Sequence, residues 1–309
     1  MVSTKHPSPL SSLSHLDGRG DLKPQQSAYS KNWGEGVVVT IVWTSILLVS
    51  ASLLWLLFDI FHHGLPALSW NFLGSAPTHA GRAGGIAPML ASTLLILLVC
   101  LSVCLPLGLG TAMLLSEFVP QQNIFGRLVR RSLDVLAGVP SIVFGLFGNA
   151  FFCKTLGLGF SIVSGGLTLA CMALPILIRS TEEGFRSVPG DYRSAAAALG
   201  LSKSSAILKV ILPAAIPGLM VGTVLGIGRA LAETAALIFT SGYVDRMPSS
   251  LLDSGRALSV HIYDLAMNVP GGDKNAYGSA LILITLIVII NACATTVGSH
   301  YLKRRILTV

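Results

Sequence analysis

Apolar residues in this chain are gathered into long runs that short polar segments separate. A transmembrane helix needs about 20 predominantly apolar residues. Six runs approach or exceed that length, and Pro residues inside the longer ones are compatible with tilted or kinked membrane helices. The six runs are 37–58, 87–115, 133–152, 160–178, 214–240 and 276–298. This pattern predicts an all-α integral membrane protein with six transmembrane helices.

Composition supports the membrane interpretation. Hydrophobic residues make up 52% of the 309 residues and charged residues only 11%, whereas soluble domains average about 25% charged. Residues 1–36 are polar and rich in Ser, Pro and Gly, and they lack the short apolar region and cleavage site of a signal peptide. They are predicted to form a disordered cytoplasmic tail.

The formal net charge of +7 does not indicate nucleic-acid binding. The basic residues lie in loops beside apolar runs and form no continuous basic face. If the amino terminus is inside, 15 Lys and Arg residues lie in inside segments and five in outside segments. Because cytoplasmic loops carry the excess of Lys and Arg, both termini are predicted to be cytoplasmic.

The segment 194–213, SAAAALGLSKSSAILKVILP, is too polar to cross a bilayer and too regular for a plain linker. Its first helix-forming run stops at Gly200, and a second amphipathic run ends at Leu212 and Pro213. Glycine tolerates the positive φ that a sharp turn between two helices requires. The segment therefore predicts a helix, a glycine turn and a second helix beside the cytoplasmic face of the membrane.

The spacing of this segment resembles the "EAA" loop of ABC importer permeases, which is Glu-Ala-Ala, three residues, Gly, nine residues, an aliphatic residue, one residue and Leu-Pro. The matching residues are Ala195, Ala196, Gly200, Val210, Leu212 and Pro213, and Ser194 replaces the glutamate. The resemblance implies that a coupling loop, 179–213, docks on an ATPase. The alternative is an interfacial amphipathic helix without a partner.

The chain contains no GxxxxGK[ST] motif and no Gly-Lys dipeptide, so it lacks the phosphate cradle of a P-loop ATPase. We therefore expect a transporter subunit without an ATPase site, which binds no cofactor and depends on ATP used by a partner subunit. The five cysteines form no CxxC pair, and there is no HExxH motif. Neither a metal site nor a catalytic residue is predicted.

The fifth apolar run carries Gly218, Gly222 and Gly226 at four-residue intervals, which predicts a small-residue ridge for close helix packing. Arg229 and Glu233 occupy positions i and i+4 of the same run. At about 100° per residue, Glu233 lies about 20° from Gly226 and Arg229 about 60° away. Both side chains are therefore predicted to face the packed seam.

Two interpretations of this charged pair remain: a structural ion pair, or a substrate pathway in which Arg229 meets an anion and Glu233 holds it poised. A charge near the bilayer centre costs about 2.5–3.5 kcal/mol, which favours a functional reason for its presence. The planar guanidinium of arginine suits oxyanions.

Four stretches resemble the phosphate ABC importer permease of the PstA type: LDVLAGVPSIVFGLFG at 133–148, GRALAETAAL at 228–237, LSVHIYDLA at 258–266 and AYGSALILITLIVIIN at 276–291. The resemblance covers 87–305. It implies a type I ABC importer permease domain of five transmembrane helices there, preceded by a first helix at 37–58, in a bacterial plasma (inner) membrane. It also implies three kinds of partner: a PstC-type permease, two PstB-type ATPase subunits and an extracytoplasmic PstS-type phosphate-binding protein.

The family has proline where this chain has Ala236, so the sequence does not predict the helix bend that a proline would cause. Three other functions stay open. One is a permease for another oxyanion such as sulfate or molybdate, with a similar coupling loop. A second is a membrane-embedded enzyme that uses Arg229 and Glu233 on a lipid phosphate. The third is an assembly scaffold with no pathway of its own.

Overall fold

The computed structural model describes residues 33–120 and 122–306, so most of the predicted tail 1–36 lies outside the described residues. Short 3₁₀ and π helices are labelled η. The elements are α1 (Trp33–Gly64), η1 (Leu65–Ala67), α2 (Trp70–Gly74), β1 (Pro77–Thr78), η2 (His79–Gly81), β2 (Ala83–Gly84), α3 (Ala87–Met113), η3 (Leu114–Phe118), α4 (Ile124–Ala137), α5 (Ser141–Gly148), η4 (Asn149–Thr155), α6 (Ile162–Ser187), α7 (Gly190–Ala198), α8 (Lys203–Ala206), η5 (Ile207–Ile211), α9 (Leu212–Ala232), α10 (Ala235–Ile238), α11 (Leu258–Met267) and α12 (Asp273–Ile306).

Backbone contacts divide the chain into two units, Met1–Leu56 and Leu57–Val309. The described part of the first unit is a single apolar helix with almost every side chain exposed. Within the described residues, five helices are long and apolar enough to cross a membrane, or six if a bent pair counts as one span. An exposed, continuously apolar helix is stable in lipid, because lipid tails solvate its side chains and the helix satisfies its own backbone groups.

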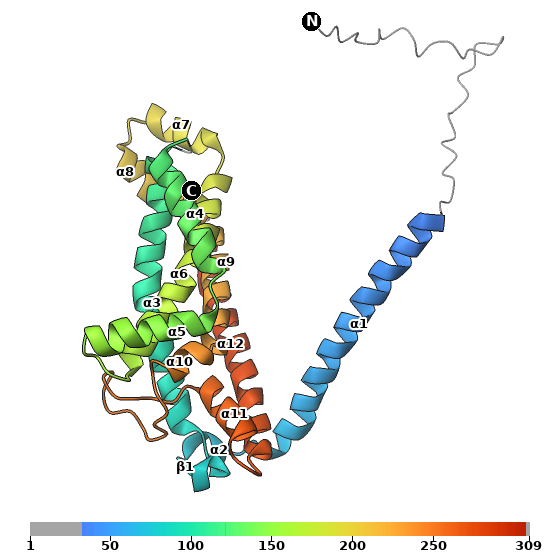
Figure 1. The fold of residues 1–309 in the computed structure, drawn as a ribbon. Helices are drawn as coiled ribbons and strands as arrows, with labels where there is room; N and C mark the ends of the chain where they lie inside the picture. The colour runs from blue at the N-terminus through green and yellow to red at the C-terminus, as the bar shows by residue number, and fades with distance from the viewer. Residues whose placement is uncertain (1–32, 121, 307–309) are drawn as a thin grey trace, which may run out of the picture. The chain divides into compact units, whose positions relative to one another are not determined.

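The second unit is a bundle in which α3 and α9 both pack on α6. Of the candidate spans, α6 is the most buried. The short helices α7 and α8 lie at one end of this bundle, and α2, β1 and α11 lie toward the other (Figure 1). The two strands form a small antiparallel pair with Pro77 opposite Gly84. We call residues 190–213, from α7 through α8 and η5 to the start of α9, the coupling segment; this segment and the strand pair mark opposite ends of the unit.

Helices α6 and α9 approach closely because glycines face one another. A Cβ atom added to Gly184 would lie 2.7 Å from the Cα of Gly218, so the two backbones are in direct contact. Along the same seam Gly222 lies against Ser180, whose hydroxyl donates to the carbonyl of Gly218 at 2.9 Å. Gly226 has more room, with its nearest neighbour 3.8 Å from an added Cβ. The small-residue ridge therefore lies against α6, and its tightest point is at Gly218.

The third apolar run is not the single helix 133–152 that its hydrophobicity predicts. Helix α4 ends at Ala137, α5 begins at Ser141, and the two are bent by 102°. Pro140 lacks an N–H group, and the residue before a proline is disfavoured in the α conformation, so the helix breaks at this point.

The fifth run also differs from expectation at its start. The sequence predicts a separate short helix ending at Leu212 and Pro213, whereas α8, η5 and α9 follow one another as a continuous helical span, Lys203–Ala232. A π turn, η5, immediately precedes α9, and Pro213 falls within the first turn of α9. Proline donates no N–H to the helical ladder, and the π turn lies directly before the point where that hydrogen bond is missing.

The tight contact between α6 and α9 leads to a stability prediction. In Gly184→Ala, the new Cβ meets the backbone of Gly218 and forces the helices apart, a strain of about 1–3 kcal/mol. The matched control is Gly228→Ala on α9, where an added Cβ meets nothing within 4 Å. Thermal unfolding in detergent should show a lower midpoint for Gly184→Ala and an unchanged or higher one for the control. Equal midpoints would contradict the packing described here.

Candidate coupling and anion sites

The turn in the coupling segment is a glycine cap. Gly200 has φ +69°, in the left-handed region, and its N–H donates to the carbonyl of Ala197 at 3.0 Å. The N–H of Leu201 donates to Ala196 at 3.1 Å. These two bonds form a Schellman motif, which satisfies the last carbonyls of α7 and reverses the chain toward α8.

The residues that match the loop motif have different environments. Ala196 is buried and Ala195 is exposed, while Val210, Leu212 and Pro213 are half-buried. Val210 belongs to η5, and the last two residues start α9. The motif therefore combines inward-facing packing positions with an outward-facing side.

Apolar side chains on the exposed side of the coupling segment are absent from the motif. Leu199, directly before the glycine, is 79% exposed, and Tyr192 and Leu208 are also exposed. Exposed apolar groups here are compatible with the docking on an ATPase that the loop motif implies. Periodicity alone could not identify them, because the same residues would suit a buried helix face.

An ion pair that the sequence did not predict attaches the coupling segment to η3, the π turn at the end of α3. Arg193 of α7 donates to both carboxylate oxygens of Glu117, at 3.2 Å and 2.5 Å. The Glu117 side chain is only 6% exposed. The hydrogen bonds that Arg193 donates to this carboxylate raise the pKa of Arg193 and so stabilise its charged form. The two residues lie 76 positions apart in the chain.

A second buried carboxylate holds the neighbouring helices. Glu182 of α6 accepts from Arg130 of α4 at 2.7 Å and from Arg186 at 2.7 Å, and its side chain is 3% exposed. The pairs with Glu182 neutralise its buried charge at the α7–α8 end of the bundle. Nearby, the exposed Asp134 accepts from Arg179.

The charged pair in the fifth run does not share one helix, contrary to the i, i+4 expectation. Helix α9 ends at Ala232, and Glu233 is extended, with φ −77° and ψ 128°. The carbonyl of Glu233 accepts from the Ser259 hydroxyl at 2.6 Å, and its carboxylate accepts from the N–H of Ala236 at 3.4 Å. These bonds replace the helical ones, so the helix breaks without a proline.

Arg229, in the last turn of α9, therefore lacks the partner that the sequence suggested. Among the described residues no ion pair joins it to Glu233, and its buried Nε has no hydrogen-bond partner. The residue is half-buried, but its Nε is a buried donor without an acceptor, which carries a free-energy cost. An anionic ligand would remove that cost by accepting from it.

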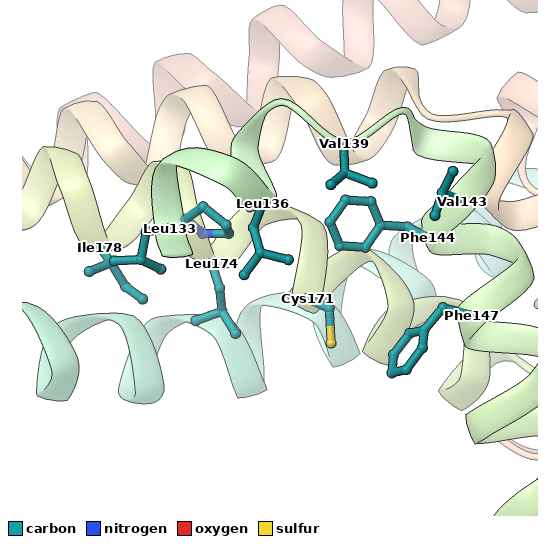
Figure 2. Close-up of a pocket in the computed structure, with 10 residues that line it drawn as sticks. Leu133, Leu136, Val139, Val143, Phe144, Phe147, Cys171, Leu174 and Ile178 are labelled. Carbon is teal, nitrogen blue, oxygen red and sulfur yellow. The ribbon is translucent and has the colours of Figure 1, made fainter. Parts of the chain in front are cut away.

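The bend between α4 and α5 leaves a pocket of about 480 Å³. Figure 2 shows residues of α4, of the α4–α5 break, of α5 and of α6 around it; they include Leu133, Leu136, Val139, Val143, Phe144, Phe147, Cys171, Leu174 and Ile178. This lining is apolar and offers no group to neutralise an ion. Since an unpaired ion is strongly disfavoured in apolar surroundings, the pocket is unsuited to an oxyanion.

The known proteins that this chain is similar to are permease components of ABC transporters. Residues 104–307 match the family model for the binding-protein-dependent transport system inner membrane component. The chain is 30% identical to the probable ABC transporter permease protein YqgI of Bacillus subtilis over 83% of its length and 92% of that protein. It is 34% identical to the phosphate transport system permease protein PstA of Mycobacterium leprae, over 82% of this chain and 85% of that one.

Two solved structures share the fold. A methionine ABC transporter, MetNI, in an inward-facing conformation contains a chain with a TM-score of 0.53 and 18% identity, covering 70% of this chain and 94% of that one. A bacterial ABC transporter for alginate import gives a TM-score of 0.54 at 13% identity, covering 88% and 96%. These similarities confirm the expected all-α fold of the type I ABC importer permeases.

The buried Glu182 leads to a second stability prediction. In Glu182→Gln, Arg130 and Arg186 lose their shared carboxylate, and breaking a buried pair in this way costs about 3–5 kcal/mol. The neighbouring Glu183 is exposed, so Glu183→Gln is the matched control. Thermal unfolding in detergent should separate the two variants by several degrees, and indistinguishable unfolding would show that the cluster contributes no net stability.

Proposed function

The chain belongs to the family of binding-protein-dependent transport system inner membrane components, and from that premise we propose that it is the permease subunit of an ATP-driven phosphate importer. Membership makes it a multi-pass inner-membrane ABC importer permease, a transporter subunit rather than an enzyme. Phosphate is the further step. It is supported by relatives named as phosphate transport system permease proteins, which match more than four fifths of the chain.

The main support for an anionic substrate is the unsatisfied side chain of Arg229. It lies at the end of a candidate membrane span, and within the described structure its buried Nε has no partner. Its guanidinium offers donors in a planar fork that matches the oxygens of phosphate. Glu233 lies just beyond the end of the same helix. Its negative charge would weaken an anion held too tightly and so assist release.

The proposed complex follows from the family and from the coupling segment. This chain forms half of the pathway with a related PstC-type permease. Two PstB-type ATPase subunits use the ATP, and this chain binds no cofactor. Both termini lie in the cytoplasm, so the α7–α8 end meets the ATPase, and the opposite end meets a PstS-type phosphate-binding protein. Each ligand shifts the pathway between its states only by its differential affinity for them.

Other oxyanions, sulfate or molybdate, are the second candidate, since a guanidinium also binds them. An enzyme acting on a lipid phosphate is disfavoured, because such an enzyme has no need of a coupling loop and the family consists of transport components. Uptake by cells that lack the endogenous subunit separates these functions. Labelled phosphate, but not sulfate or molybdate, should accumulate when this chain is restored with its partners.

Substitution of Arg229 tests the pathway directly. Arg229→Gln keeps a hydrogen-bonding side chain but removes the charge, so phosphate uptake should fall about ten- to hundredfold, the loss expected for hydrogen bonds to a charged group. Complex assembly should remain intact on size-exclusion chromatography. The exposed Arg127 provides the control, and Arg127→Gln should leave uptake unchanged. Normal uptake by Arg229→Gln would refute the role of this residue.

Gly200 tests the docking of the ATPase. An added Cβ at Gly200 meets nothing within 4 Å, so only the positive φ restricts substitution. Asparagine tolerates that region far better than a β-branched residue. Gly200→Val should therefore weaken co-purification of the ATPase, whereas Gly200→Asn should largely preserve it. Equal recovery of the ATPase with both variants would show that the turn does not position the docking surface.

A further inference from the structure

The end of α3 is a π turn, η3, which both halves of the coupling segment contact. From α7, Arg193 forms its two-pronged ion pair with Glu117. From the start of α8, the Nζ of Lys203 lies 4.5 Å above the ring centre of Phe118, at cation–π distance. Two cations on opposite sides of the Gly200 turn therefore hold two adjacent residues of one turn.

Arg193 also joins this turn to the end of α6. Its guanidinium donates to the carbonyl of Val188 at 2.9 Å and to that of Phe185 at 3.0 Å. The last carbonyls of a helix have no intrahelical partner, and a cation there also complements the helix dipole. One side chain thus links three elements: α7, the end of α6 and η3.

The start of η3 is attached to the membrane helices. Arg130 of α4 donates to the carbonyl of Leu115 at 2.8 Å, and the same guanidinium pairs with Glu182 of α6. The coupling segment therefore contacts η3 at Glu117 and Phe118, while the α4–α6 charge cluster contacts it at Leu115. A π turn carries one extra residue per hydrogen-bonded ring, and such turns are frequent at functional sites.

We infer that η3 receives the movement of the coupling segment, and that Arg193 and Lys203 are positioning residues that transmit it to α3 through Glu117 and Phe118. This inference rests on the proposed function, in which an ATPase moves α7 and α8. The Gly200 turn itself is exposed and held only by local backbone bonds. The two-pronged pair is buried on its carboxylate side, and charge-assisted bonds of this geometry are strong and directional. Force on α7 thus passes into α3 through this pair.

The test uses the complete importer in proteoliposomes, with the partner permease, the ATPase and the phosphate-binding protein. The measured quantity is phosphate imported per ATP hydrolysed, together with the amount of ATPase bound. In Glu117→Gln and Arg193→Gln, the ratio should fall about tenfold, as expected for losing a charge-assisted hydrogen bond. The ATPase should remain bound. The exposed residues Glu183 and Arg127 supply matched controls, and Glu183→Gln and Arg127→Gln should keep the wild-type ratio.

Lys203→Gln provides a variant that is expected to fold, because Lys203 is exposed. Its ratio should fall about threefold, in line with an exposed cation–π contact. An unchanged ratio in Lys203→Gln and in whichever of the two ion-pair variants assembles would overturn the inference while leaving the importer intact. A wild-type complex that assembles and hydrolyses ATP without importing phosphate would overturn the proposed function instead.

Discussion

The backbone contact between α6 and α9 at Gly184 and Gly218 is the constraint on which the α7–α8 end of the bundle depends. The coupling segment connects the end of α6 to the start of the span that contains α9. Gly184 lies in the last turn of α6 and Gly218 in the first half of α9, so this contact restricts the distance that the segment must bridge. The segment can then fold as two short helices around Gly200. A larger residue in the seam would move both ends of the segment at once.

Ion pairs between helices add a second constraint to the backbone contact of α6 and α9. Glu182 and Glu117 are buried carboxylates, and each is held by arginine from another helix or from the coupling segment. Removing one partner from such a pair leaves an uncompensated charge, which is far costlier than losing an exposed pair. The arrangement of α3, α4, α6 and α7 is therefore specified by which arginine reaches which carboxylate, in addition to apolar contacts that many arrangements would satisfy.

The sequence predicted the features that depend on local composition. Long apolar runs gave the membrane helices, the four-residue glycine repeat gave the packing ridge, and Gly200 gave the turn. Two breaks were missed for different reasons. Pro140 lies within an apolar run long enough to read as one span, and at Glu233 the Ser259 hydroxyl replaces a helical hydrogen bond. The Glu117–Arg193 pair spans 76 residues, and only the assembled bundle brings such distant groups together.

The contrast between Arg229 and two ion-paired arginines, Arg130 and Arg193, supports its proposed assignment to the pathway. Arg130 and Arg193 each pair with a carboxylate and also donate to backbone carbonyls. A guanidinium used in this way has few donors left for a ligand. An anionic ligand would have to displace the protein's own carboxylate from it. In the described structure, Arg229 has no carboxylate partner and a buried Nε without an acceptor. Because satisfying that donor is favourable, an oxyanion would find an unoccupied donor at Arg229, which supports the role proposed for this residue.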